Sequence, residues 1–389
     1  MAISAAIGQA RALDGREAAL QATHQALNHL GSAAPNLAIL VSSYQYDAQQ
    51  IVSGVSSLLG NVPIIGFSSP AGLTSQGIHS HSVVVALLSA GDTRIQVRWL
   101  PGYTQATREV TAQLAQLLAQ NPAQAALFFA DGFNADAEQL CANLPSGVNA
   151  IGGLSGGDLH SGSAYQIGGN QASAGGLAVV QLEGQLQVGL GYGHGWQPVG
   201  THFRVTRARG FWLRTLDGRP ASEAYARLFG YPARDWAFPP LTHLVRLYPL
   251  GIAQPDSSLL VRSPLRVEAD GSLRLNTALR DGAEAYLLVG SLMACREAAR
   301  NAAQQALAAL HGGRPALALV LADIAWQMLF EAEPGAEIAA LQQVLGDEVP
   351  VIGGYTLGQI VPRAEDTPLF LNQHLVVVVF GEPPKKGGR

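Results

Sequence analysis

Residues 189–200, GLGYGHGWQPVG, place a histidine between two glycines and flank it with aromatic rings. In an extended strand the alternate glycines share one face, while Leu190, Tyr192, His194 and Trp196 share the other. Neutral imidazole is a common ligand of iron, and the rings add stacking area, so His194 is a candidate cofactor ligand together with Tyr192 and Trp196. The bare glycine face predicts that another layer packs closely on this strand. The alternative is a structural histidine that is hydrogen-bonded at the end of the strand.

A second histidine, His243 in LTHLVRLYPLGI, alternates with the apolar residues Leu241 and Val245. On a strand this spacing puts the three side chains on one face. His243 lies just past the expected domain seam, where a pocket between domains is expected to form. It is therefore the second candidate ligand of iron, and a purely structural role is again the alternative.

The segment GLSGG at 153–157 fits the pattern G-x-S-x-G, in which a strained strand-to-helix turn exposes a nucleophilic serine. Ser155 follows a predicted strand, which is half of the required context. The residues after it, DLHSGSAYQIGG, have no helical periodicity, so the other half is missing. A serine hydrolase is therefore a minor alternative, and the preferred prediction is that the protein is not an enzyme.

Polar residues near strand ends form a second class of candidates, suited to a small polar solute. Arg262 and Arg266 flank a short SPL segment and together suit a carboxylate, although surface salt bridges are an equal alternative. Glycine-rich segments can also hold anions through their backbone, but no G-K-[ST] follows any of them, which argues against a nucleotide. The candidate ligand-binding residues are Ser68, Ser69, Gly152, Gly153, Ser155, Arg262, Tyr355, Thr356 and Asn372.

The elements that position these residues repeat along the chain. The form V-x-x-I-G-x-x-S/T occurs at 62–69, 148–155 and 349–356, each time some 20 to 35 residues after an apolar strand. A helical pattern lies between strand and motif, and another strand follows. This unit of strand, helix, strand, glycine-rich loop and strand predicts an α/β fold of two domains, with mixed sheets covered by helices and built from repeated β-α-β-β units. Ligand sites are expected at the strand ends.

Composition restricts the function classes. The chain has 389 residues, 48% hydrophobic and 13% charged, with a net charge of −4 and no Lys/Arg run, which argues against nucleic acid as a partner. The two cysteines, Cys141 and Cys295, belong to no CxxC motif. No signal peptide and no membrane-spanning apolar run is predicted, so a cytoplasmic protein without membrane insertion is expected.

Taken together, the order of these motifs resembles the FIST family of bacterial sensory proteins, over nearly the whole chain from about Leu37 to Phe380. The resemblance rests on GFSSPAGL, FFADGFNADAEQL, AIGGLSGG, GYGHGWQPVG, YPLGI, VRSPLRVEADGSLRL, GGYTLGQIVP and NQHLVVVV. It implies a FIST N-like ligand-sensing domain at 30–230, a FIST C-like domain at 231–381 and a disordered tail at 382–389. It also implies that the protein senses a small ligand and regulates a separate protein.

One standalone branch of this family binds haem, senses nitric oxide and controls a histidine kinase in a two-component system. By resemblance we expect non-covalent haem b, with His194 on the iron, nitric oxide as the signal, and a histidine kinase or other signalling protein as partner. The chain lacks the CxxCH motif of covalently attached haem. The alternative is a sensor of an amino acid or other small polar solute without haem.

The chain departs from the family in one segment. Where relatives commonly have a C-x-G-R-like stretch after a strand of the C-terminal domain, this chain has LADIAWQMLF, with Asp323 and Trp326. If that stretch lines the ligand site, the ligand of this protein differs from that of typical relatives.

Overall fold

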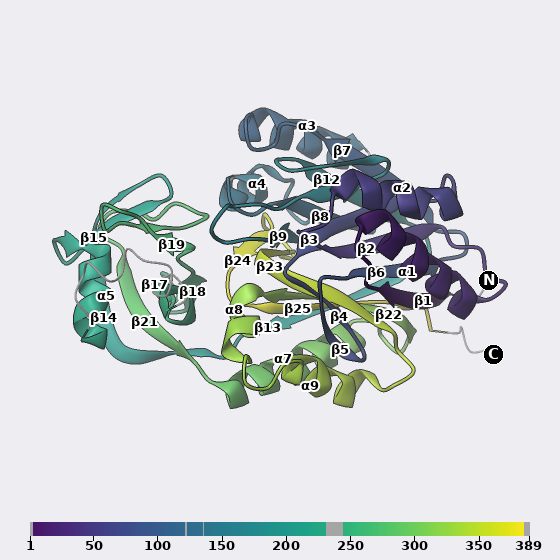
Figure 1. Ribbon diagram of the computed structural model, residues 1–389. Coiled ribbons are helices and arrows are strands. Elements are labelled where there is room, and N and C mark those ends of the chain that lie inside the picture. Colours follow the sequence, from purple (N-terminus) through teal and green to yellow (C-terminus); the bar gives the residue numbers. More distant parts are fainter. Residues whose placement is uncertain (1–2, 121–122, 135, 231–243, 385–389) are drawn as a thin grey trace.

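The computed structural model describes residues 3–120, 123–134, 136–230 and 244–384. Figure 1 shows a larger body and a smaller lobe that projects from one side of it. We use "smaller lobe" for residues 196–290 and "body" for the rest. Mixed sheets and covering helices confirm the predicted α/β class.

The body contains two sheets packed face to face, with helices on both outer sides (Figure 1). The first sheet has the order β1-β6-β2-β3-β10-β11, and α1 and α2 cover its outer face. Its elements are β1 Ser4–Ala10, α1 Gly15–Leu30, β2 Leu37–Ser43, α2 Ala48–Leu59, β3 Ile64–Ser69, β6 Val83–Ser89, β10 Gln166–Gly168 and β11 Gln171–Ser173.

The second sheet has the order β13-β25-β22-β23-β9-β8-β12-β7. Strands β24 and β4 also pair with β23, and β5 pairs with β4. Its strands are β4 Ala71–Thr74, β5 Gly77–Ser80, β7 Arg94–Leu100, β8 Ala125–Asp131, β9 Ala150–Ser155, β12 Leu177–Glu183, β13 Gln187–Gly193, β22 Arg314–Asp323, β23 Val351–Val361, β24 Leu369–Leu371 and β25 Leu375–Glu382. Helices on its outer face are α3 Thr107–Gln120, α4 Ala137–Asn143, α7 Leu292–Ala308, α8 Ile324–Leu329 and α9 Ala336–Leu345.

Because the central strands are covered on both faces, they are apolar throughout rather than alternating. All residues of β2 and of β8 are buried. One set of alternate side chains, including Ile39 and Phe129, packs between the sheets, and the other set packs under the helices. Within the described ranges no helix has the length and apolar character needed to cross a bilayer.

The predicted repeat is present in the sheets. The pairs β2–β3, β8–β9 and β22–β23 are parallel, and a later strand, β6, β12 or β25, lies antiparallel beside the first member of each pair. One or two short strands separate it from the pair in the sequence. The glycines of the motif lie within the second strand of each pair, not in loops as the sequence suggested. A Cβ atom on Gly66, Gly152 or Gly353 would lie 2.6, 2.4 or 2.3 Å from a carbonyl oxygen of the parallel neighbour. Close approach of backbone to backbone therefore requires glycine at this position of the repeat.

The smaller lobe leaves the body after β13 and returns to it at α7. Its sheet has the order β18-β17-β21-β14-β15-β20-β19, with β16 beside β15. Its elements are β14 Trp196–Arg209, β15 Trp212–Leu216, β16 Arg219–Pro220, α5 Ala221–Phe229, β17 Leu250–Ala253, β18 Leu259–Arg262, β19 Arg266–Val267, β20 Leu273–Arg274 and β21 Glu284–Gly290. At the other end of the chain Glu382 closes β25, and residues 385–389 of the expected tail lie outside the described residues.

The GLGYGHG segment forms β13 and the turn into β14, and its glycine face packs on α7 as predicted. Added Cβ atoms on Gly189 and Gly191 would lie 2.0 Å from the carbonyl oxygens of Ala306 and Ala302, one helical turn apart. Small residues on both surfaces thus let the strand lie directly against the helix backbone.

This close packing predicts a graded effect of adding one methyl group. Gly191→Ala is expected to lower the free energy of unfolding by about 1–3 kcal/mol, because the new Cβ overlaps the Ala302 carbonyl and the strand must shift. Gly193→Ala is the matched control, since its Cβ would come no closer than 3.3 Å to the Ala298 side chain and 3.4 Å to the Ala298 carbonyl oxygen. Urea unfolding of both variants measures the difference. Equal losses would contradict the packing argument.

Candidate functional site

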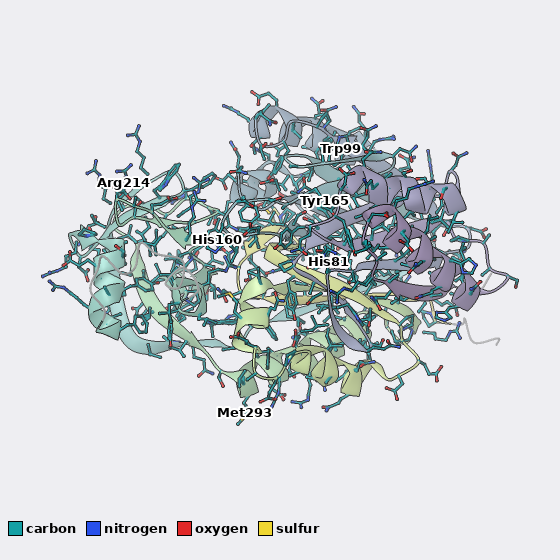
Figure 2. The ribbon with its side chains drawn as sticks, in the orientation of Figure 1. His81, Trp99, His160, Tyr165, Arg214 and Met293 are labelled. Atoms are coloured by element: carbon teal, nitrogen blue, oxygen red, sulfur yellow. The ribbon has the colours of Figure 1, made fainter. Side chains whose placement is uncertain are left out.

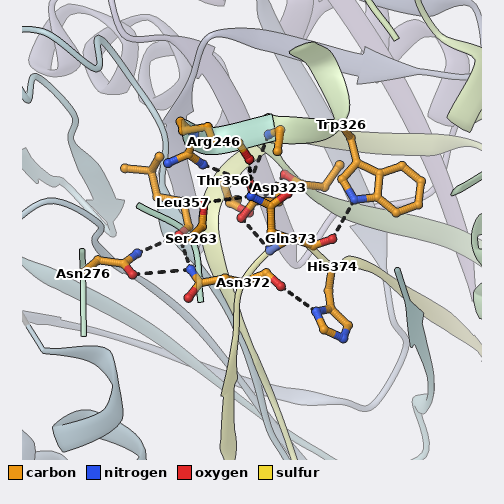
Figure 3. A network of polar contacts seen from close by, with 12 residues as sticks. Arg246, Ser263, Asn276, Asp323, Trp326, Thr356, Leu357, Asn372, Gln373 and His374 are labelled. Carbon is orange, nitrogen blue, oxygen red and sulfur yellow. Dashed lines mark hydrogen bonds and ion pairs between the residues drawn. The ribbon is translucent and has the colours of Figure 1, made fainter. Parts of the chain in front are cut away.

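Buried polar side chains gather where the smaller lobe meets the body, and Figure 3 shows their network. The smaller lobe supplies a residue just before β17 and residues that follow β18 and β20, while the body supplies the end of β22 and the link from β24 to β25. We call this set the interlobe cluster: Arg246, Ser263, Asn276, Asp323, Asn372 and Gln373.

The Asp323 carboxylate lies at the centre of the interlobe cluster. As the last residue of β22 it caps α8, since Oδ1 accepts a hydrogen bond from the backbone N of Ala325 at 3.0 Å. The same oxygen accepts from Arg246 Nη2 at 3.0 Å, and Oδ2 accepts from the backbone N of Gln373 at 2.9 Å. Neither charged side chain of this pair has exposed surface. Burial lowers the pKa of Arg246, and the Asp323 charge opposes that shift.

Gln373 is held in an uncommon backbone conformation, with φ at 64°. Such a left-handed conformation costs roughly 1–2 kcal/mol for a residue with a side chain. Several hydrogen bonds offset this cost: Nε2 donates to Arg246 O at 2.8 Å and to Ser263 Oγ at 2.7 Å, and the Gln373 carbonyl accepts from Trp326 Nε1 at 2.9 Å. The surroundings thus fix the side-chain amide of Gln373 between the lobe and the body.

Asn276 and Asn372 connect the two parts a second time. Both side-chain amides donate to the Leu357 carbonyl, at 2.8 and 3.1 Å, and Asn372 Nδ2 also donates to Asn276 Oδ1 at 3.4 Å. The β20 side of the smaller lobe is therefore bonded directly to β23 of the body.

The interlobe cluster contains polar atoms that are buried yet have no hydrogen-bond partner among the described residues. They are Arg246 Nε and Nη1, Gln373 Oε1 and Asn372 Oδ1. Leaving such a group unpaired costs about 1–3 kcal/mol, and more when it is charged. The free set combines donors on a cation with amide oxygens that accept hydrogen bonds. This set matches a ligand that carries both an acceptor group and a donor group.

Of the candidates named from the sequence, Thr356 and Asn372 lie in this network. Thr356 Oγ1 donates to the Ala322 carbonyl at 3.2 Å and accepts from Gln359 Nε2 at 2.8 Å. The neighbouring Tyr355 hydroxyl donates instead to the buried Glu337 carboxylate. Successive residues of β23 thus point to opposite faces, and Tyr355 is directed away from the interlobe cluster.

Arg262 is as deeply buried as Arg246, but its donors are engaged. It forms an ion pair with Glu138 and donates from Nη1 to the carbonyls of Val261, at 3.1 Å, and Phe370, at 3.3 Å. Its guanidinium also lies 5.5 Å from the centroid of the Phe370 ring. Arg246 therefore replaces Arg262 as the arginine with free donors in this part of the protein.

The remaining candidates lie inside the body. Ser68 Oγ donates to the Gly156 carbonyl at 2.8 Å, and Ser69 Oγ donates to the Ala71 carbonyl at 2.6 Å. Gly152 and Gly153 are buried in β9. Ser155 Oγ is buried without a hydrogen-bond partner in the described residues, and no helix follows β9 directly, so the strand-to-helix turn of a nucleophilic serine is absent from this described segment.

His194 lies in the short link between β13 and β14, with its ring edge-on to His374 at a centroid distance of 4.6 Å. Its Nδ1 accepts a hydrogen bond from the backbone N of Trp196 at 3.2 Å. Burial lowers the His194 pKa, so the ring is neutral at pH 7 and its proton is on Nε2. Iron ligation through Nε2 requires the proton on Nδ1, so His194 in this arrangement does not fit an iron ligand.

The other residues proposed with His194 have different surroundings. Tyr192 is 37% exposed, whereas Trp196 is buried and donates from Nε1 to the Leu247 carbonyl at 3.4 Å. His243 lies outside the described residues. Among the described residues, no group of three or more His, Cys, Asp and Glu side chains is arranged to hold a metal ion.

His374 was not identified from the sequence. Its Nδ1 lies 2.7 Å from the Asn372 carbonyl, which only accepts, so Nδ1 carries the proton and Nε2 keeps a free electron pair. Burial lowers the pKa of His374 to about 3, and the neighbouring His194 acts in the same direction. His374 is therefore a neutral histidine with the proton arrangement that His194 lacks.

The comparisons with known proteins identify domains along nearly the whole chain. Residues 36–219 match the FIST N domain and residues 221–362 match the FIST C domain. No curated protein matches the chain.

Solved structures match over most of their length but at low similarity. A cyanuric acid hydrolase from A. caulinodans is 10% identical with a TM-score of 0.38, covering 98% of this chain and 99% of that chain. A second cyanuric acid hydrolase structure is 8% identical with a TM-score of 0.33, covering 98% and 100%. T. maritima PurL complexed with ATP is 12% identical with a TM-score of 0.25, covering 98% and 72%. Scores this low carry no argument about this chain.

The depressed pKa of His374 predicts a pH-dependent stability. The unfolded chain protonates this histidine below its ordinary pKa of 6.5, whereas the folded protein keeps it neutral down to about pH 3. Its contribution is therefore fully present above pH 6.5 and is lost as the pH falls toward 3. We expect a loss of about 2 kcal/mol between pH 6.5 and pH 5.

Urea unfolding at these two pH values measures the loss, and His374→Gln is expected to remove most of it. The Gln side chain keeps a donor for the Asn372 carbonyl, so the variant isolates the titration. An unchanged pH dependence in this variant would assign the effect to other groups.

Proposed function

This chain belongs to the FIST family, whose domains are signal-transduction sensor domains that bind small ligands, and we propose that its ligand is a free amino acid held at the interlobe cluster. The unpaired atoms of Arg246, Gln373 and Asn372 are the observation that carries this proposal. An amino acid supplies a carboxylate for the guanidinium donors and an ammonium group for the amide oxygens.

The charges of the interlobe cluster support a ligand that is zwitterionic rather than simply anionic. Arg246 and Asp323 already neutralise each other, and both are fully buried. A ligand with a net negative charge would leave an uncompensated charge in this buried place, which is costly. A zwitterion adds no net charge and pairs with donor and acceptor groups together.

The position of the interlobe cluster supports a sensing role. Arg246 comes from the smaller lobe, while Asn372 and Gln373 come from the body, so a ligand bound to all three contacts both parts. Such a ligand stabilises the observed arrangement of lobe and body relative to any other arrangement. The size of this effect equals the difference in the binding free energy of the ligand between the two arrangements. We propose that a separate signalling protein, such as a histidine kinase, responds to this arrangement.

The proposal predicts that one or more amino acids raise the melting temperature in a saturable way, because they bind only the folded protein. Arg246→Lys keeps a cation beside Asp323 but lacks the additional fixed donors, so the affinity for the amino acid is expected to fall about tenfold or more. Thermal unfolding with each of the common amino acids, followed by calorimetric titration, measures both effects.

Arg262→Lys is the matched control, because Arg262 is equally buried but its donors already have protein partners. This variant is expected to be less stable than the wild type while keeping its affinity for the amino acid. If no amino acid stabilises the wild type, or if both variants lose affinity equally, the interlobe cluster is not an amino-acid site.

Haem with nitric oxide as the signal is the second candidate function, and the state of His374 favours it. The free electron pair on Nε2, with Nδ1–H donated to a carbonyl, is the arrangement of a histidine that ligates a metal. Bound haem would supply an iron that takes up nitric oxide. The His194 ring, edge-on to His374, must move aside for this.

This candidate predicts a Soret band on addition of haem that is lost in His374→Ala and kept in His194→Ala. A shift of the band when nitric oxide is added to the reduced protein tests the signal. Absence of a band, or equal loss in the two variants, excludes iron ligation by His374.

A further inference from the structure

A cleft of about 230 Å³ lies between the smaller lobe and the body, apart from the interlobe cluster. Phe133, Asn134 and Ser161 line it from the body, and Leu265, Arg266 and Arg274 line it from the smaller lobe. The body side includes the loop after β9, on which Figure 2 labels His160 close to the smaller lobe. The cleft is therefore bounded by both parts of the protein.

The two arginines of the cleft form an unfavourable pair in the absence of a ligand. Arg266 of β19 and Arg274 of β20 are direct cross-strand partners in an antiparallel ladder. Like charges in this position destabilise a sheet. Burial lowers the pKa of Arg274, and the nearby charge of Arg266 lowers it further. Glu268 balances part of this charge through a 3.1 Å contact with Arg266 Nε.

Arg274 is fixed in place, yet it keeps free donors. Its guanidinium lies 4.5 Å from the Trp212 ring centroid and 5.4 Å from that of Phe211, and Nη2 donates to the Phe133 carbonyl at 3.3 Å. In the described part of the chain, Nε and Nη1 of Arg274 and both terminal nitrogens of Arg266 donate to no protein acceptor. Preorganised guanidinium donors of this kind favour oxyanions.

We propose that this cleft is an anion site that takes a dianionic phosphate group, free or as a small ester, between the arginines of the smaller lobe and the body. Two adjacent guanidinium groups match two negative charges, and binding relieves the repulsion across β19 and β20. Carboxylates beside the lining residues do not occupy these donors. Glu268 contacts Arg266 Nε, Asp131 accepts from the backbone N of Phe133 and Asn134, and Asp158 accepts from Ser161 and the backbone of His160. This site goes beyond the amino-acid site and does not depend on it.

The test is calorimetric titration of the full chain with inorganic phosphate and with phenyl phosphate, against chloride at matched ionic strength. Wild type is expected to bind saturably, and Arg266→Gln and Arg274→Gln are each expected to weaken binding about tenfold to a hundredfold. Tighter binding of phenyl phosphate would identify an ester as the ligand, and equal binding would identify the phosphate group alone.

Arg207→Gln is the matched control, because Arg207 is an exposed arginine of the same lobe that does not line the cleft. It is expected to leave phosphate binding unchanged, and circular dichroism verifies that all variants are folded. No saturable binding by the wild type, or an equal loss in Arg207→Gln, would overturn the proposal. Arg266→Gln is expected to keep any response to amino acids, so failure here is distinguishable from failure of the interlobe cluster.

Discussion

The arrangement of the interlobe cluster depends on one buried carboxylate, that of Asp323. It caps α8, holds the backbone of Gln373 in a left-handed conformation and pairs with Arg246 of the smaller lobe. A buried ion pair adds little net stability, because desolvation offsets most of the attraction. Its effect here is positional: two oxygens fix a helix end, a strand link and an arginine from three separate segments. These contacts therefore also fix the positions of the unpaired donors of Arg246 and the unpaired amide oxygen of Gln373.

That carboxylate is held in turn by a scaffold in which backbones approach closely. Glycine lets β3, β9 and β23 lie against their parallel neighbours, and lets β13 lie directly on α7. The β22–β23 pair, which belongs to this repeat, ends at Asp323 and Thr356, which are register partners. The same packing rule that builds the repeat therefore brings a polar residue from each strand to the edge of the sheet that faces the smaller lobe. Strand ends carry the polar groups because strand centres are buried on both faces.

The sequence was sufficient for the features that repeat or that follow from local pattern. The α/β class, the β-α-β-β units and the packing of the glycine face of β13 all follow from spacing. The interlobe cluster did not, because its members come from five separate segments spread over more than a hundred residues and carry no shared spacing. Arg246 and Arg262 look alike in the sequence, and only their neighbours show which one has free donors. The departure from the family at Asp323 and Trp326 is the one sequence signal that falls within the segments of the interlobe cluster. The proton position that separates His374 from His194 depends on single hydrogen bonds, which no pattern reveals.

The net charges of the two proposed sites explain why they would select different ligands. At the interlobe cluster a cation and an anion are already paired without exposed surface, so only a ligand of zero net charge avoids a buried excess. The arginines of the cleft are only partly buried, and two of them face one carboxylate contact, so the cleft carries a net positive charge. Asn276 of the interlobe cluster follows Arg274 of the cleft by two residues, and both donate to carbonyls of the body. A ligand at either place therefore acts on the same short segment of the smaller lobe.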